Sequence, residues 1–261
     1  MKLSCVTASY VADLIGYPGE VDWDLASRTI EASPLLETVD GLLARLAPAK
    51  LDGIEFWYPH VAASKLTPAL ASALRRRLAA HGQVCSACAG GVTDPDDDPY
   101  RTEEAFQIAV LLGAPVIAGH VPAATIRKLG PYSSRYGVRM AFENGGEKDA
   151  MPVLKVTEGG GQWLGAAIDT GNMAAQGGDP VLAIRQLGRR IIHVHFKDVP
   201  AVGSHDCVAP GKGIVDVKAV IRELKAFGYD GWLSIEIETG DRDPTDEIVA
   251  SAETLRELWG R

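Results

Sequence analysis

One stretch of alternating polar and apolar residues carries side chains that could do chemistry. It runs from Ile191 to Val199, where His193, His195 and Lys197 alternate with apolar residues. Alternate side chains of a β-strand point to the same face, so we expect these three to share one face of a strand. Two imidazoles at this spacing can ligate a metal or transfer protons. A half-buried strand with a solvated polar face shows the same pattern, but acidic residues after other apolar segments favour the chemical interpretation.

Three carboxylates follow apolar segments in this way. Glu143 follows 138–142, Asp169 follows 164–168, and Glu236 lies within 232–237. Each alone could cap a helix, but grouped with His195 they would repel one another unless a cation bound them. Three oxygen donors and one nitrogen therefore predict a site for one divalent metal ion, with Mn²⁺ or Mg²⁺ favoured and Co²⁺ or Zn²⁺ as alternatives. Glu238 shares a face with Glu236 and is its rival as the fourth ligand.

Eight apolar segments alternate with helical patterns along the chain. The expected strands are 3–8, 53–57, 84–89, 115–119, 138–142, 164–168, 191–199 and 232–237. This order predicts an α/β fold, a single (β/α)8 TIM barrel domain over residues 1–261 with its active site at the C-terminal strand ends. A doubly wound sheet would need a glycine-rich turn after the first strand, and 7–10 is not one.

The helical segments are less uniform. Ser33 and Pro34 are expected to cap and begin the first helix, which leaves the stretch 10–23 irregular. The segment 123–137 has only a weak helical pattern.

Composition narrows the class of protein. The 261 residues are 46% hydrophobic and 23% charged, and the net charge of -8 argues against a nucleic-acid partner or an anionic membrane. No apolar run reaches transmembrane length. Four cysteines do not form a disulfide framework at this length, and we expect a cytoplasmic protein with buried thiols. A homo-oligomer is compatible with the sequence.

Four motifs resemble one family. They are Phe142–Gly145, Asp169–Asn172, His193–Asp198 and Gly231–Glu236, and they resemble the strand ends of the sugar phosphate isomerase/epimerase superfamily. This xylose isomerase-like barrel group includes ketose 3-epimerases, inosose dehydratases and apurinic-site endonucleases. The resemblance implies that Glu143, Asp169, His195 and Glu236 are the metal ligands and that a small carbohydrate is the substrate. It also implies that Glu143 and Glu236 are catalytic and exchange a proton beside a carbonyl through an enediolate.

The chain departs from ketose 3-epimerases at several positions. Gly145 and Gly146 stand where many members carry histidine, Asn172 replaces a substrate-contacting histidine, and the arginine that follows the strand-seven histidine is absent. The motifs around His195 and Glu236 look closer to inosose dehydratases.

Four functions are therefore considered. The first is a metal-dependent isomerase or epimerase of a small sugar, sugar phosphate or polyol. The alternative is a dehydratase or β-eliminating lyase on a keto-polyol or keto-glycoside. An apurinic-site endonuclease ranks lower, because six histidines and a net charge of -8 suit neither several metals nor a basic groove. A non-catalytic sugar binder also ranks lower, because no ligand position is lost.

Further residues are predicted to contact substrate from the barrel mouth. These are Glu55, Trp57, His120, Asn172, Lys197 and Lys212. Lys197 is expected one layer nearer the mouth than His195, where it could neutralise an enolate. Lys212 lies between two glycines, where it could meet a phosphate or carboxylate, and a flexible surface turn is an equal alternative. His193 is expected one layer deeper, as a hydrogen-bonded support beneath the metal.

Overall fold

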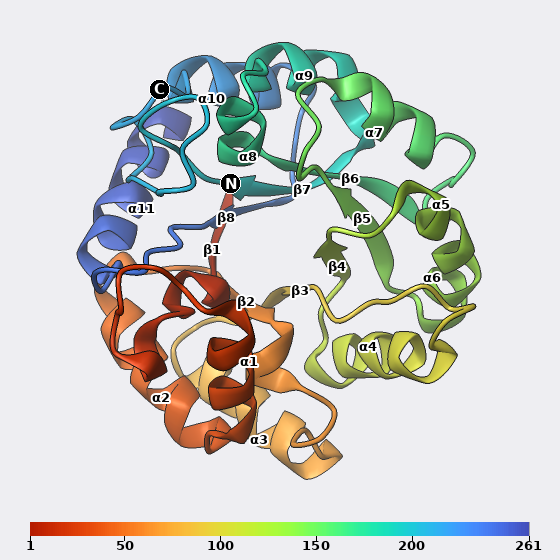
Figure 1. The fold of residues 1–261 in the computed structure, drawn as a ribbon, viewed down its shortest axis with the longest axis vertical. Coiled ribbons are helices and arrows are strands. Elements are labelled where there is room, and N and C mark those ends of the chain that lie inside the picture. The colour runs from red at the N-terminus through yellow and green to blue at the C-terminus, as the bar shows by residue number, and fades with distance from the viewer. Residues whose placement is uncertain (261) are drawn as a thin grey trace.

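Eight strands, paired in the order in which they occur in the chain, close into a parallel barrel in the computed structural model, which describes residues 1–260. Strand β1 pairs with both β2 and β8, which closes the ring (Figure 1). The strands are β1 Lys2–Val6, β2 Gly53–Trp57, β3 Val84–Ala89, β4 Val116–Gly119, β5 Arg139–Glu143, β6 Leu164–Asp169, β7 Ile191–Phe196 and β8 Trp232–Ile235. The predicted (β/α)8 fold is confirmed.

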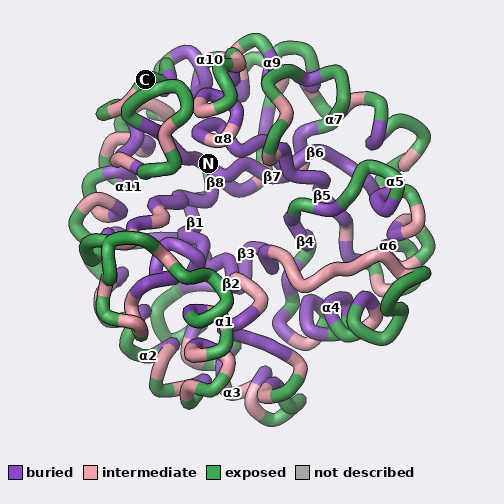
Figure 2. The backbone as a smooth tube through the Cα atoms, in the orientation of Figure 1, coloured by how far each residue is buried: buried purple, intermediate pink, exposed green. Residues whose placement is uncertain are grey.

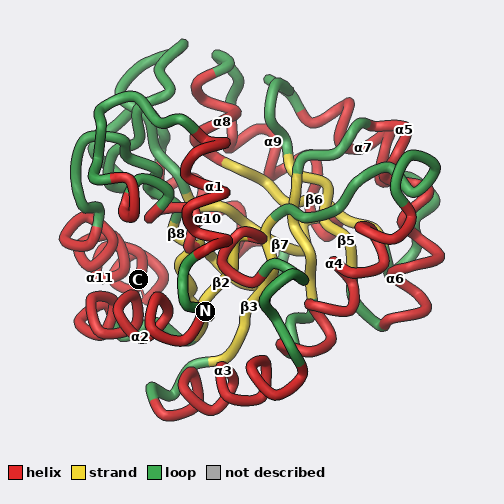
Figure 3. The backbone as a smooth tube through the Cα atoms, turned by 60° about the horizontal axis from the view of Figure 1, so that its bottom comes forward, coloured by secondary structure: helices red, strands yellow, loops and turns green. Residues whose placement is uncertain are grey.

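Helices connect the strands and surround them, as the turned view in Figure 3 shows. They are α1 Trp23–Ala32, α2 Leu35–Leu46, α3 Pro68–Ala80, α4 Pro99–Leu112, α5 Ala123–Ile126, α6 Gly130–Tyr136, α7 Ala150–Thr157, α8 Thr170–Ala175, α9 Pro180–Leu187, α10 Val217–Ala226 and α11 Thr245–Gly260. Several begin with a side-chain cap, as at Asp179, which accepts hydrogen bonds from the amides of Val181 and Leu182. Among residues 1–260, no helix has the length and apolar character needed to cross a membrane.

The first connection differs from the prediction. Residues 23–32 form α1, with the Asp22 side chain capping its first turn, and Ser33 ends this helix rather than starting the next. Pro34 then stands at the N-cap of α2. Within α1, Ala26 and Ile30 are the buried residues.

Apolar residues pack on both sides of the sheet, and Figure 2 shows that most of the strands are buried. The larger cluster packs strands against helices and includes Val194 and Phe196 of β7. A smaller one joins alanines of β3 to β6 with Val116, and Ile192 packs against it. In a regular strand Ile192 would share a face with Val194, but the register shifts between β6 and β7 at this residue. The bulge turns Ile192 to the smaller cluster, where Gly165 makes room, since a β-carbon there would lie 2.8 Å from it.

Candidate metal centre

Four polar side chains from neighbouring strands meet at the C-terminal end of the barrel. Glu143 ends β5, Asp169 ends β6, His195 lies in β7, and Glu236 directly follows β8. One ligand atom from each lies within 4.8 Å of the others, and all four residues are buried. The register explains the meeting, because Asp169 pairs with His195 across β6 and β7. The structure thus brings together the four residues that the sequence proposes as metal ligands.

The imidazole of His195 lies between two layers of carboxylates. Its Nδ1 is 2.7 Å from Glu143 Oε1 and 3.4 Å from Glu236 Oε2, whereas its Nε2 is 3.0 Å from Glu55 Oε1. The other oxygen of Glu55 lies 2.8 Å from His193 Nε2. Burial opposes ionisation of Glu55, but the charges of His193 and His195 outweigh it and hold its pKa well below the ordinary value. An ionised carboxylate only accepts hydrogen bonds, so both Nε2 atoms donate to it and the Nδ1 of His195 faces the cluster.

The carboxyl groups of the cluster ionise unequally. Burial opposes ionisation of Glu143, but the charges of His195 and His120 outweigh it and lower the pKa of Glu143 to about 2. At Asp169 and Glu236 burial dominates over the attraction of the neighbouring ammonium, and it raises the pKa of both groups. Burial would lower the pKa of His195, but the surrounding carboxylates together raise it well above its ordinary value.

Lys197 adds a positive charge beside the cluster. Its Nζ lies 2.8 Å from Glu238 Oε2, 3.3 Å from Glu236 Oε2 and 3.4 Å from Asp169 Oδ2. Burial would lower the pKa of this ammonium, but the carboxylates raise it well above its ordinary value. Since Glu238 pairs with Lys197, Glu236 rather than Glu238 is favoured as the fourth ligand.

The donor set fits a divalent cation. Asp169 Oδ2 and Glu236 Oε2 are buried, and among the described residues neither has a hydrogen-bond partner, although Lys197 Nζ forms long ion pairs with both, at 3.4 and 3.3 Å. Buried polar atoms without partners are uncommon in native proteins, and a cation between them would satisfy both. Three carboxylates and one imidazole match the oxygen-rich sites that Mn²⁺ and Mg²⁺ prefer. A second possible ligand group, Glu55, His193 and His195, is better explained by the hydrogen bonds just described.

A cavity of about 780 Å³ adjoins this cluster at the mouth of the barrel. Lys197 and Glu238 line it, together with Asn172 after β6 and Trp23 of α1. Lys197 and Glu238 therefore connect this cavity to the cluster, whereas none of the four cluster residues lines the cavity. A substrate in this cavity would reach the cluster past Lys197.

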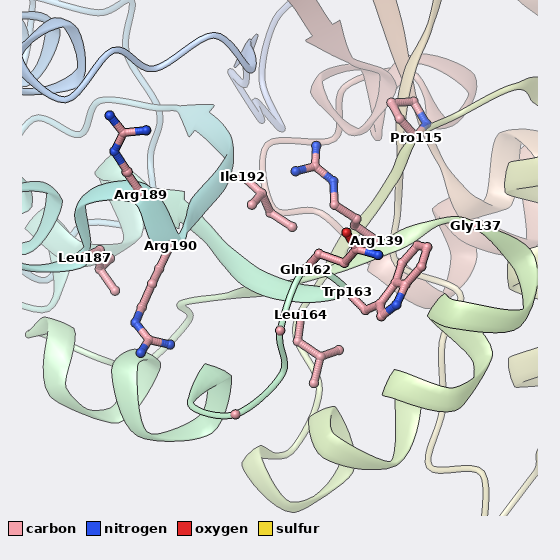
Figure 4. A pocket seen from close by; sticks show the side chains of 12 residues that line it. Pro115, Gly137, Arg139, Gln162, Trp163, Leu164, Leu187, Arg189, Arg190 and Ile192 are labelled. Carbon is pink, nitrogen blue, oxygen red and sulfur yellow. The ribbon is translucent and has the colours of Figure 1, made fainter.

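A larger cavity, of about 1010 Å³, lies at the other end of the strands. Arg139, Arg189 and Arg190 line it, and none of the four cluster residues does. Figure 4 shows that Arg189 and Arg190 point away from each other, so the arginines do not converge on one point. The mouth cavity, by contrast, lies beside the cluster through Lys197 and Glu238, and a smaller cavity of about 360 Å³ is lined by Glu143 itself.

The chain resembles known proteins in both sequence and fold. The sequence profile of the family described as xylose isomerase-like TIM barrel matches residues 43–258. The chain belongs to this family. It is 31% identical over 149 residues to the rhizopine catabolism protein MocC of Rhizobium meliloti, which covers 48% of this chain and 45% of that protein. It is 31% identical over 86 residues to inosose dehydratase of Lacticaseibacillus casei, 27% of this chain and 29% of that protein. These alignments span less than half of the length of either relative.

Solved structures extend the likeness in fold. A structure of L-ribulose 3-epimerase has a TM-score of 0.70 and 21% sequence identity, with 100% of this chain and 94% of that chain covered. At this identity the comparison supports the shared barrel architecture. The sequence relatives of this xylose isomerase-like barrel thus include enzymes named as dehydratases, and a protein of similar fold is named as an epimerase.

The other residues predicted to contact substrate lie at different distances from the cluster and the mouth cavity. His120 is close to the cluster, with Nε2 3.5 Å from Glu143 Oε1, and its contact with substrate stays a prediction, as does that of Asn172. Trp57 packs edge-on against Trp23, with ring centroids 5.6 Å apart, and is partly buried. Lys212 is exposed and is not among the residues that line the mouth cavity, so its predicted contact with substrate is not supported.

Two buried acids have roles that the sequence did not reveal. Glu55 was expected to touch substrate, but it is 0% exposed and both its oxygens accept from imidazoles, which leaves no surface for a substrate. Asp198 is the last residue of the motif His193–Asp198. Its carboxylate accepts hydrogen bonds from the amides of Val199, Gly211, Gly213 and Val215 and so fixes the loop after β7. The glycines on either side of Lys212 are the sequence feature that could have indicated a tight turn around the Asp198 carboxylate in this xylose isomerase-like barrel.

Proposed function

We propose that this protein is a divalent-metal-dependent isomerase or epimerase that removes a proton from the carbon beside a carbonyl of a small sugar or polyol. The observation that carries the proposal is the placement of Glu143 and Glu236 on the same cluster as Asp169 and His195. Two carboxylates at one site can take a proton from carbon and return one. Mn²⁺ or Mg²⁺ is the ion that the donor set favours.

The roles of the residues follow from their surroundings. When bound, a divalent ion would act as a Lewis acid toward the carbonyl oxygen and acidify the neighbouring C–H. Glu143 and Glu236 would be the two carboxylates that exchange a proton with the substrate carbon. Lys197 would place positive charge near an enolate oxygen, and His193 with Glu55 would hold His195 in position.

A dehydratase is the second candidate. Sequence relatives named inosose dehydratase support it, whereas the likeness to the named epimerase is one of fold. In this reaction the same proton leaves, but the electron pair then expels a β-hydroxyl, and the Lys197 ammonium beside Glu236 could protonate it. The two candidates share their first step and differ in the fate of the enolate.

The experiment begins with metal analysis of the purified protein after incubation with Mn²⁺. The loaded protein is then given ketoses and inososes in D₂O and the products are weighed by mass spectrometry. A gain of one mass unit without loss of water supports the epimerase, and loss of water supports the dehydratase. Glu236→Gln should abolish either signal, while the matched surface variant Glu223→Gln should keep it. A protein without stoichiometric metal, or a Glu236→Gln variant with full exchange, would disprove the proposal.

A further inference from the structure

More acidic than basic side chains line the mouth cavity. Four carboxylates line it, those of Glu20, Asp206, Glu238 and Asp241. Two fully cationic side chains line it, those of Lys197 and Arg242. The carboxylates come from three separate segments, before α1, after β7 and after β8. A ligand in this cavity is therefore surrounded by negative charge from several sides.

Both cations are already engaged by acids. Arg242 donates to Glu247 at 2.9 and 3.1 Å and to Asp241 at 2.8 Å. Lys197 is 2.8 Å from Glu238, which also lines the cavity, so this pair remains even if the other carboxylates near Lys197 turn to a metal. Within residues 1–260, no lysine or arginine of the cavity wall is left without an acidic partner.

The loop after β7 offers no replacement. Lys212 was the sequence's candidate for holding a phosphate, but it is exposed and absent from the cavity wall. His205 lines the cavity from the same loop as a single exposed imidazole. Proteins bind phosphate and carboxylate groups through free guanidinium, ammonium or convergent amide groups. The described part of the cavity wall lacks a free guanidinium or ammonium group for this purpose.

Hydroxyl groups suit the same surroundings well. A hydroxyl donates its proton to a carboxylate in a charge-assisted hydrogen bond. The wall also contains Asn172 and Gln176, whose amides both donate and accept. An uncharged polyol can thus satisfy the acidic wall, whereas an anionic group meets like charge.

From this balance we propose that the cavity selects an uncharged polyhydroxylated substrate and discriminates against phosphorylated or carboxylated ones. The inference rests on the proposed function only in taking the mouth cavity as the place where a carbohydrate binds. Glu20 and Asp206 are the specificity-determining residues, because they are exposed carboxylates of the wall that lack a basic partner at the cavity. Because these charges are exposed, salt weakens the discrimination.

The test compares matched pairs of probes on the Mn²⁺-loaded protein by isothermal titration. One pair is D-fructose and D-fructose 6-phosphate, and the other is myo-inositol and myo-inositol 1-phosphate, with inorganic phosphate alone to measure direct binding to the metal. We expect the neutral member to bind at least about tenfold more tightly at low salt, with a smaller ratio in 0.5 M NaCl. The double variant Glu20→Gln, Asp206→Asn should narrow the ratio to about threefold. Glu158→Gln removes an exposed carboxylate outside this cavity and should leave the ratio unchanged.

The outcomes separate this inference from the proposed function. Equal or tighter binding of the phosphorylated member in either pair, or no binding of any probe, overturns the inference. An unchanged ratio in the double variant overturns the roles of Glu20 and Asp206. Neutral compounds that bind to the loaded protein but show no deuterium exchange or loss of water would instead contradict the proposed function. Exchange on phosphorylated compounds alone would leave the function standing and disprove the selectivity.

Discussion

Glu55 offers the sharpest test of how the barrel interior supports the metal centre. The change is Glu55→Gln, which keeps the size of the side chain and removes its charge. In the native protein each oxygen accepts one hydrogen bond, at 2.8 Å from His193 and at 3.0 Å from His195. Glutamine has one accepting oxygen, so its amide group must face one of the two imidazoles as a donor.

Glu55→Gln is expected to weaken metal binding because it changes which ring nitrogen of His195 carries the proton. If the amide donates to Nε2 of His195, the ring must carry its proton on Nδ1, the atom 2.7 Å from Glu143 that faces the cluster. A protonated nitrogen cannot ligate a metal. Loss of such a supporting hydrogen bond costs about 10- to 100-fold in metal affinity, which corresponds to about 1.4–2.8 kcal/mol.

The assay is titration of the metal-free protein with Mn²⁺, accompanied by circular dichroism to verify the fold. Glu223→Gln is the control, because it also neutralises a glutamate but one that pairs with Arg185 at the surface. Glu55→Asp keeps the charge and should lose less affinity than Glu55→Gln. A folded Glu55→Gln protein that binds Mn²⁺ as tightly as the wild type would refute the reasoning.

Three further perturbations follow from the same geometry. Lys197→Gln removes a cation that shares carboxylates with the metal, so Mn²⁺ should bind about tenfold more tightly while the metal-free protein melts at a lower temperature; weaker Mn²⁺ binding would contradict this. Asp198→Ala removes four amide contacts and should cost at least about 3 kcal/mol and expose loop 200–213 to proteolysis; unchanged cleavage would show that other contacts hold the loop. Burial, together with the charge of Lys65, lowers the pKa of His60 to about 3. The unfolded chain therefore takes up this proton at a higher pH than the folded protein does. As a result, the free energy of unfolding falls as the pH drops from 6.5 toward 3, by about 2 kcal/mol at pH 5. In His60→Gln, the free energy of unfolding measured by urea denaturation should change less with pH. An equally steep loss in this variant would show that other groups cause the pH dependence.

Local patterns were sufficient for much of the architecture. Eight apolar segments separated by helical periodicity determine a βα alternation, and the closed barrel follows from packing such units side by side. Because parallel strands bring their C-terminal ends to one mouth, the positions of Glu143, Asp169, His195 and Glu236 in the chain were enough to predict their meeting. In each case the information lies within a few residues of the position concerned.

Other features depend on contacts between distant segments. The partners of Glu55 lie 138 and 140 residues away, so its role as a support for imidazoles is invisible until the barrel closes. The bulge at Ile192 arises from the register between β6 and β7, which alternation within one strand does not encode. The exclusion of Lys212 from the cavity wall likewise depends on how Asp198 folds the loop.

The stretch around His195 shows most clearly what the local sequence determines and what depends on tertiary contacts. Its sequence determines a strand with polar residues on alternate positions, because the β-backbone alternates side chains regardless of context. Only the tertiary structure decides that the Nδ1 of His195 faces carboxylates at the mouth while its Nε2 faces Glu55 below. Those directions are set by side chains from β2, β5 and β8, whose positions result from closure of the whole barrel.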